Sequence, residues 1–459
     1  CSIDEYVKED DPVRVYDAFI EALDHKELNL ALTNHAVGPP SYDPIAMLKV
    51  LVYGYSYGWR SSRKLERALH HNLSFIWLSG GLKPDHKTIA EFRRNHKSTL
   101  KRVLKQCARM CLKLGLIEGS TLFVDGSKFR ANAGKSQTKT MECWEQHREE
   151  VEHQIEELLN ECQKTDDKEK GSLVKVSKEL AVKSKLKNKI DHLVKEFKDE
   201  EKVNGTDPDS KIMKGRQGSH SGYNTQMVTD EAHGLIVSMD VSTSANDLNE
   251  LHKQVKNAEE TLCKQAQNIC ADAGYSSVND IEPLLKEGRT VIVPNNKQAQ
   301  KQSTEDPFSK EAFLYDIDND IYICPNGQEM HLRQHRDKRN RLEYRIKSAS
   351  ICRACPHFGE CTKSKSGRRL YRLMNEHVRE HLANSYESSE GQQLYAKRKM
   401  RVELPFGHIK SNLGAGAFLL RGINGVKAEI SLLGTCFNLS RMITIVGGVK
   451  PMIERLQSI

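Results

Sequence analysis

Two aspartates in this chain each follow a short apolar run with the composition of a buried strand. Asp125 ends "LFVD" and Asp272 ends "ICAD", and each is followed by glycine within two residues. A carboxylate at the end of a buried strand is costly unless it is paired, hydrogen-bonded or bound to metal. One such aspartate alone is more often a turn residue or a helix cap. Two on adjacent strands would repel unless a cation lay between them, which favours Mg²⁺ or Mn²⁺.

A third carboxylate with suitable surroundings is Glu403, in "YAKRKMRVELPFGHIK". Basic side chains around it are suited to holding phosphates beside a metal site. Lys410 comes seven positions later and shares a helical face with Glu403 if the helix continues through Pro405. An exposed basic helix with one ordinary glutamate has the same composition, and spacing alone does not decide between the two interpretations.

The residues after Asp125 suit a phosphate-binding site. Gly126 would leave room beside the metals, and Ser127, Lys128 and Arg130 are polar or basic. The order of the surrounding elements predicts a mixed sheet. A strand at 121–125 precedes two strands, "SGYNTQMVTD" and "GLIVSMDVSTS", and then a helix at 246–264 capped at Asn246-Asp247. A strand in "AQNICADAGYSS", a helix "VNDIEPLLKEG" and a strand "TVIVPNN" follow.

The other segments differ in composition. Residues 1–118 are predicted to be a helical domain whose basic residues, among them Arg93 and Arg94, either bind DNA or form a solvated surface. Residues 137–204 are rich in Glu and Lys and predict an inserted helical hairpin with a polar loop. We therefore predict an α/β protein with a catalytic core formed by 119–136 and 205–300, completed by C-terminal helices over 379–459.

Residues 301–378 are predicted to be an insertion that contains four cysteines, and residues 300–375 are polar and predicted to be irregular. Cys352 and Cys355 form a CxxC pair, with Cys324 before it and Cys361 after it. This spacing is a moderate signal for zinc, with His331 or His357 as a substitute for one thiol. Four unligated thiols are the alternative.

The chain resembles the DDE-type transposases of bacterial insertion sequences, which have an RNase H-like catalytic core and, in many members, an InsH-like helical N-terminal domain. The resemblance covers most of the chain in the family's order. It rests on "SYDPIAMLKVLVYGYSYGWRSSRKLERALHHNLSFIWLSGGLKPDHKTIAEFRR", "LFVDGSKFRANA", "DPDSKIM", "GYNTQMVTD", "ADAGYSS" and "YAKRKMRVELPFGHIK". Two features depart from the family pattern: four residues separate Arg398 from Glu403 where the signature has three, and Leu404 stands where proline often follows the glutamate.

The resemblance implies that Asp125, Asp272 and Glu403 are the catalytic, metal-binding triad. It implies that Tyr395, Arg398 and Lys410 position the DNA at the transposon ends. The implied reaction is DNA cleavage and strand transfer with Mg²⁺ or Mn²⁺, by a homodimer or larger assembly on terminal inverted repeats and target DNA. The implied location is the cytoplasm, at the nucleoid.

Two other functions remain open. One is a catalytically inactive, transposon-derived DNA-binding protein, against which the retention of all three carboxylates argues. The other is a structure-specific nuclease of the same fold. The chain begins with Cys1 rather than methionine, so we expect a fragment or a processed protein, which mildly favours the inactive form.

Composition agrees with a nucleic-acid partner without requiring one. The formal net charge is +8 over 459 residues. The sequence shows no signal peptide and no apolar run long enough to span a bilayer. It also lacks a glycine-rich phosphate-binding loop, so ATP dependence is not indicated.

Overall fold

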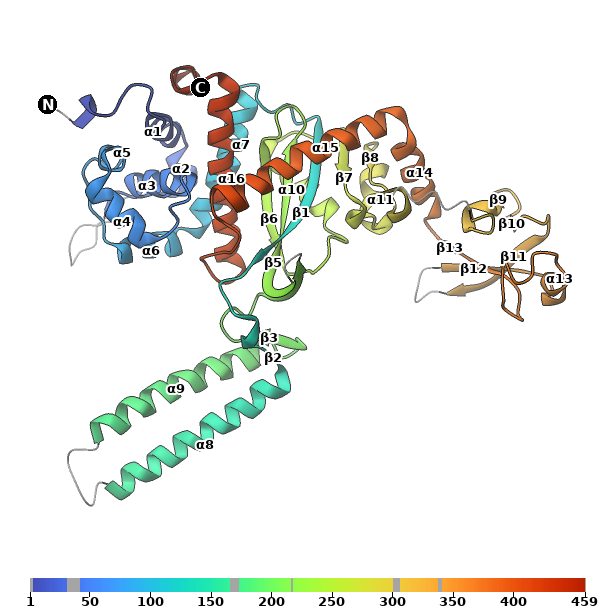
Figure 1. The fold of residues 1–459 in the computed structure, drawn as a ribbon, viewed down its shortest axis with the longest axis horizontal. Coiled ribbons are helices and arrows are strands. Elements are labelled where there is room, and N and C mark those ends of the chain that lie inside the picture. Colours follow the sequence, from blue (N-terminus) through green and yellow to red (C-terminus); the bar gives the residue numbers. More distant parts are fainter. Residues whose placement is uncertain are drawn as a thin grey trace. The chain divides into compact units, whose positions relative to one another are not determined.

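The computed structural model describes residues 3–30, 42–165, 173–215, 218–299, 306–336 and 341–458. The chain divides into two compact units, one formed by Cys1–Cys270 with Ala396–Ile459 and the other by Ala271–Tyr395. The predicted core segment 205–300 is therefore shared between them. Helices and strands carry the labels of Figure 1.

The first unit begins with short helices that pack on one another. Asp43 accepts hydrogen bonds from the Ile45 and Ala46 N–H groups at 3.0 and 3.4 Å, and Pro44 follows as the first helical residue. Asp85 caps a later helix by accepting from the Thr88 N–H at 2.7 Å. The helices are α1 Val13–Glu21, α2 His25–Leu28, α3 Pro44–Ser56, α4 Ser62–His71, α5 Leu73–Leu78, α6 His86–Asn95 and α7 Lys97–Lys113, after a 3₁₀ turn at Ile3–Glu5.

The sheet of the first unit is built around β1, Thr121–Arg130. β5, Gly218–Asp230, runs antiparallel to β1, with Asp125 opposite Met227. The far edge of β5 is shared by β4, Lys211–Gly215, and β6, Ile236–Ser242, while β7, Asn268–Ala271, lies beyond β1. Strands β6, β5 and β1 are antiparallel neighbours, and the chain then crosses to β7 on the other side of β1. The predicted mixed α/β fold is thereby confirmed.

Two local predictions about this sheet are wrong. Asp125 does not end its strand, because β1 continues to Arg130 through pairing with the early residues of β5. The crossover helix α10 is Leu251–Leu262, and its cap residue Glu250 makes no side-chain capping bond. Asp247 instead accepts hydrogen bonds from Asn224 Nδ2 and Gln226 Nε2, both at 2.7 Å.

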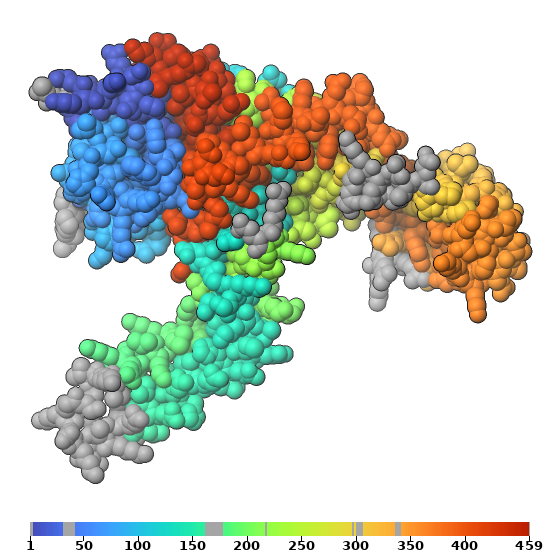
Figure 2. Space-filling view, viewed as in Figure 1, coloured from blue at the N-terminus to red at the C-terminus, as the bar shows by residue number. Residues whose placement is uncertain are grey.

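The inserted helices α8, Met141–Thr165, and α9, Leu173–Glu196, form the predicted hairpin and stand away from the sheet of their unit (Figures 1 and 2). Strands β2, Thr138–Thr140, and β3, Lys202–Asn204, pair at its base. Trp144 anchors the base by donating to the Val203 carbonyl at 3.0 Å. The predicted polar loop falls on 166–172, outside the described residues.

The chain returns to the first unit within α15, Ser389–Gly407. This helix continues through Pro405 and passes into a π-helix, His408–Asn412. The long helix α16, Ile423–Val446, is largely buried against α7 and β6, and α17, Val449–Gln457, ends the described chain (Figure 1). Among the described helices, none by itself has the length and apolarity to cross a membrane; α16 and α17 together satisfy that test only as a pair bent by 105°.

The second unit contains a five-stranded antiparallel sheet in the order β13-β12-β11-β10-β9. The prediction of irregular structure over 300–375 is therefore wrong. The short strands pack around a small hydrophobic core, which consists of Phe313, Tyr322, Met330, Tyr344 and Leu370. The elements of this unit are α11 Val278–Lys286, β8 Thr290–Ile292, α12 Asn296–Ala299, β9 Leu314–Asp316, β10 Ile321–Ile323, β11 Glu329–Arg336, β12 Arg341–Ile346, α13 Ala349–Arg353, β13 Arg369–Leu373 and α14 Glu376–Glu387, with 3₁₀ turns at Ala273–Tyr275 and Lys310–Ala312.

Candidate active site

The side chain of Asp125, on β1, contacts α15. Arg398 Nη1 of α15 is 3.3 Å from Asp125 Oδ1, and the two side chains are 11% and 17% exposed. An ion pair this shielded from water is screened less than one on the surface. It therefore fixes both the position of the carboxylate and the rotation of α15 over the strand.

Lys410 makes a second contact between the same two segments. Its Nζ donates to Ser127 Oγ at 2.6 Å and to the Lys128 carbonyl at 3.1 Å, and lies 4.6 Å from the centre of the Phe129 ring. Asp125, Ser127 and Phe129 alternate along β1, so they share one face of the strand. The π-helix thus brings a lysine next to the strand that carries Asp125, as π-turns often do at functional sites.

Glu403 lies on α15 between these two contacts. Val402 and Phe406 on the same helix are buried, and Phe406 packs 6.1 Å from Phe129, ring centre to ring centre. Glu403 itself is exposed. The helix is therefore held to β1 before and after Glu403, which leaves its carboxylate at the solvent-facing margin of this contact.

Asp272 and Tyr395 belong to the second unit. Asp272 follows β7 directly, and its Oδ1 accepts the Gly274 N–H at 2.9 Å, as in an ordinary turn. The ring of Tyr395 packs edge-on against Tyr386, with centres 5.1 Å apart.

Gly126 does not leave room beside Asp125, contrary to prediction. A Cβ added there would lie 2.9 Å from Gln226 Nε2 and would overlap the carboxylate of Asp247. Because neighbouring residues of a strand face opposite sides, this crowding is on the face away from Asp125. Gly126 is needed there for the approach of Asp247, which sequence reasoning assigned to a helix cap.

Lys128 and Arg130 alternate with Asp125, so the pleat of β1 directs their side chains to the opposite face. The strand therefore does not place Lys128 and Arg130 on the face of Asp125, where they were predicted to contact phosphates. Arg130 instead contributes, after burial, to lowering the pKa of His220 below its usual value.

The two arginines predicted to bind DNA in the N-terminal helices differ. Arg93 is 8% exposed and donates to Tyr55 Oη at 2.8 Å and to the Arg60 carbonyl at 2.9 Å. The structure contradicts a DNA contact for Arg93, because its guanidinium is used inside the domain. Arg94 is 66% exposed and pairs with Glu91 at 3.2 Å, so it remains available to a phosphate.

Sequence reasoning missed a buried ion pair that joins the N-terminal helices to α16. Arg60 Nη1 lies 3.1 Å from Glu429 Oε1, and the Glu429 side chain is fully buried. Glu429 also accepts the Leu419 and Leu420 N–H groups, at 2.8 and 2.9 Å. Burial raises the pKa of Glu429 above its usual value, with the N–H donors and Arg60 opposing. The sequence feature that could have indicated this buried ion pair is the single carboxylate inside the apolar stretch "KAEISLLG".

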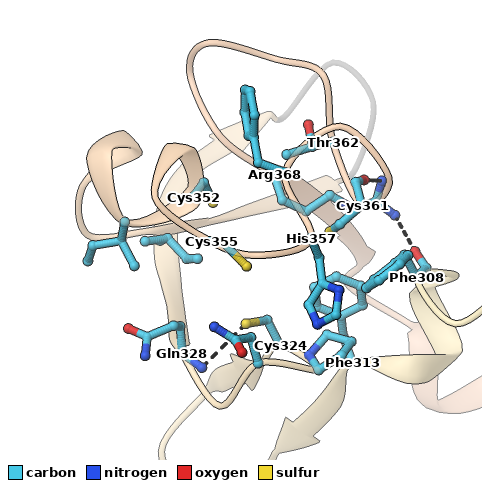
Figure 3. Close-up of a pocket in the computed structure, with 15 residues that line it drawn as sticks. Phe308, Phe313, Cys324, Gln328, Cys352, Cys355, His357, Cys361, Thr362 and Arg368 are labelled. Carbon is cyan, nitrogen blue, oxygen red and sulfur yellow. Dashed lines mark hydrogen bonds between the residues drawn. The ribbon is translucent and has the colours of Figure 1, made fainter.

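The cysteine cluster lies wholly in the second unit. Cys324, Cys352, Cys355 and Cys361 line one small pocket together with His357 and the phenylalanines Phe308 and Phe313 (Figure 3). His331 is not among the lining residues; its Nε2 is 3.3 Å from Glu329 Oε2. Across the described residues, no group of three or more His, Cys, Asp or Glu side chains is arranged so that it could hold a metal ion.

Two family models match the chain. Residues 323–443 match the model described as a transposase DDE domain, and residues 1–95 match a transposase domain, DUF772. The chain therefore contains two regions that match transposase domains, and the C-terminal one is of the DDE type. The first match includes Glu403, Arg398, Lys410 and the cysteine cluster, whereas Asp125 and Asp272 lie outside the matched residues.

The predicted family, function and enzyme class are confirmed by these matches. The transposase thus acts on DNA, and enzymes of this family generally use a divalent metal ion. A solved structure with low overall similarity is the piggyBac transposase synaptic complex with hairpin DNA, at 12% identity and a TM-score of 0.36 over 98% of this chain and 80% of that one. No curated protein matches the chain significantly.

Proposed function

We propose that Asp125, Asp272 and Glu403 are the catalytic triad with which this transposase cuts DNA at the ends of its insertion sequence and joins them to target DNA. The observation that supports this most is the docking of α15 on β1. The Arg398–Asp125 pair at 3.3 Å and the Lys410–Ser127 bond at 2.6 Å hold the helix of Glu403 against the strand of Asp125.

The donor set fits Mg²⁺ or Mn²⁺, because carboxylate oxygens are the ligands these hard cations prefer. Asp125 and Asp272 would hold one ion, and Glu403 with either aspartate the second. When bound, the ions would make water, and later a 3′-hydroxyl, more nucleophilic and would stabilise the leaving oxygen. No side chain of the protein becomes covalently attached to DNA in this scheme.

The basic residues at the site have separate tasks. Arg398 places a guanidinium beside Asp125, and its planar fork suits a phosphate as well as a carboxylate. Lys410 places an ammonium group beside Ser127, within reach of a phosphate that approaches this face. We propose that Arg398, Lys410 and Tyr395 orient the DNA end, and that exposed Arg94 contacts DNA farther from the chemistry.

Joining two ends to one target requires the ends to be held together, so we propose that the transposase acts as a homodimer or larger assembly on its terminal repeats, at the nucleoid. An inactive DNA-binding descendant would have no reason to keep all three carboxylates. A structure-specific nuclease would keep them, and is separated from a transposase by whether a pre-cleaved end is joined to target DNA.

The test uses Asp125→Asn, Asp272→Asn and Glu403→Gln in the full chain, with labelled DNA carrying the terminal sequence. Each variant should lose cleavage and strand transfer by at least about a thousandfold while binding the DNA normally. Glu390→Gln, an exposed glutamate of the same helix α15, is the matched control and should retain activity. Normal cleavage by Asp125→Asn would remove Asp125 from the mechanism.

A further inference from the structure

The segment between β12 and β13 has almost no hydrophobic core of its own. From residue 347 to residue 368, the only buried residues are Cys352 and Gly367. The two large apolar side chains in it, Ile351 and Phe358, are each 38% exposed. A loop of this length that buries so little apolar surface needs another source of order, and small modules commonly use a metal or disulfides.

The residues that this segment turns inward are cysteines. In Figure 3 the sulfurs of Cys324, Cys355 and Cys361 point toward the same pocket, and Cys352 lies at its rim. The first comes from the turn between β10 and β11, and the others from α13 and the turns after it. Two stretches of chain far apart in the sequence therefore meet at a pocket where four thiols lie among apolar side chains.

The turn that holds Cys324 has a shape suited to a thiolate. The Gly327 N–H donates to the Cys324 carbonyl at 2.8 Å, and the Cys324 N–H donates to the Gln328 carbonyl at 2.9 Å. The Gln328 N–H in turn lies 3.3 Å from Cys324 Sγ. This N–H is placed to donate a hydrogen bond to a thiolate, which is the form of cysteine that binds metal.

The other three cysteines sit in equally tight turns. The Cys355 N–H donates to the Cys352 carbonyl at 3.2 Å, and the Cys361 N–H donates to the His357 carbonyl at 2.9 Å. Gly367 closes the chain over Cys352: its φ is +80°, and a Cβ there would be 3.2 Å from Cys352 Sγ. Burial raises the pKa of Cys361; Arg368 opposes this increase, and the nearby thiols add a smaller one.

We propose that Cys324, Cys352, Cys355 and Cys361 bind one structural zinc ion that holds residues 347–368 to the sheet of the second unit. Four thiolates in a closed tetrahedron suit zinc and leave no open position for catalysis. The site is therefore separate in chemistry and role from the carboxylates. Among the described residues no group of three metal-ligating side chains is arranged to hold a metal ion, so the proposal requires the four thiols to move together when zinc binds.

His357 is the competing fourth ligand, because it lines the same pocket. If His357 were the fourth ligand in place of one cysteine, zinc would be bound by three thiolates and one imidazole. Cobalt substitution distinguishes the two, since the sulfur-to-cobalt charge-transfer absorbance grows with the number of thiolates. His357→Ala should leave zinc content and this absorbance unchanged; loss of zinc from His357→Ala would overturn the four-cysteine set.

The decisive measurement is the metal content of the full chain purified without chelator. We expect about one zinc ion per chain. A mercurial reagent that blocks the four ligand thiols should release this zinc in proportion to the thiols blocked. Absence of zinc from the unmodified protein, or mercurial titration without zinc release, would overturn the site. Because this measurement uses the unmodified chain, it does not depend on a variant that fails to fold.

Matched variants locate the site. Cys355→Ser and Cys361→Ser should lose most of the zinc, whereas Cys263→Ser, which changes an exposed cysteine in the first unit, should retain it. Asp125→Asn should also retain it, so failure of the zinc proposal and failure of the proposed catalytic triad give different results. Equal zinc in Cys355→Ser, Cys361→Ser and the unmodified chain would place the metal elsewhere.

Discussion

The face of β1 under α15 and the cysteine module of the second unit use polar side chains in opposite ways. At the first, a long strand and a long helix are already held by packing and by the Arg398–Asp125 pair, and the carboxylates are additions to a stable frame. In the second, the segment around Cys352 has no such frame. On the two proposed assignments, a metal ion on regular elements can leave without loss of the fold, whereas a metal ion held by turns is part of what orders them.

The largest effect should come from removing the two metals separately. Brief treatment with a magnesium chelator should abolish cleavage, and added Mg²⁺ should restore it fully, because the carboxylate frame persists without the ion. Release of zinc by a mercurial reagent should leave a protein that added Mg²⁺ does not restore, because residues 347–368 lose their order. Limited proteolysis measures this loss of order, and cleavage should be confined to residues 347–368 after zinc release. Full recovery of activity with Mg²⁺ alone would show that zinc does not order these residues.

The next largest effect concerns the contacts between α15 and β1. Arg398→Ala should reduce cleavage by about a hundredfold and Lys410→Ala by about tenfold, because each removes a cation aimed at the site. Lys397→Ala is the control: Lys397 is on the same helix but pairs with Glu231 at 2.6 Å. A loss in Lys397→Ala equal to that in Arg398→Ala would mean that only the overall charge of the helix matters.

A smaller effect should follow from filling the space at Gly126. Gly126→Ala should destabilise the first unit by about 1–3 kcal/mol, because the added methyl overlaps the Asp247 carboxylate. Denaturant unfolding measures this. Combining Gly126→Ala with Asp247→Ala should recover part of the loss, since the two residues are in contact. If the losses in unfolding free energy of the two single variants simply add in the double variant, Asp247 is not in energetically significant contact with Gly126.

The smallest effect separates two neighbouring arginines. Arg94→Ala should weaken DNA binding by about tenfold or less and reduce its salt dependence, with the melting temperature unchanged. Arg93→Ala should lower the melting temperature, because it leaves the Tyr55 hydroxyl and Arg60 carbonyl without their donor. Unchanged stability in Arg93→Ala would restore it as a candidate DNA contact.

The features that sequence predicted well are local ones. The Asp43-Pro44 helix start, the hairpin of α8 and α9, and the strand carrying Asp125 all depend on neighbouring residues and a regular apolar period. The mixed sheet followed from the order of such elements, and the resemblance to transposases supplied the reaction.

The features that sequence missed depend on partners far away in the chain. Residues 126–130 have no apolar run, and their strand exists because β5 pairs with it. Asp247 looked like a cap because its actual donors, Asn224 and Gln226, are on another strand. The small sheet of the second unit was missed because its strands are short and polar and each depends on the next for its pairing.

The π-helix His408–Asn412 has an evolutionary consequence. A π-turn holds one residue more than an α-turn, so it corresponds to a single-codon insertion in an ordinary helix. Deleting one codon before Lys410 would restore regular winding and swing the lysine by about 100° around the axis, away from Ser127. We therefore expect the length of this short stretch to vary less among relatives than its residue types.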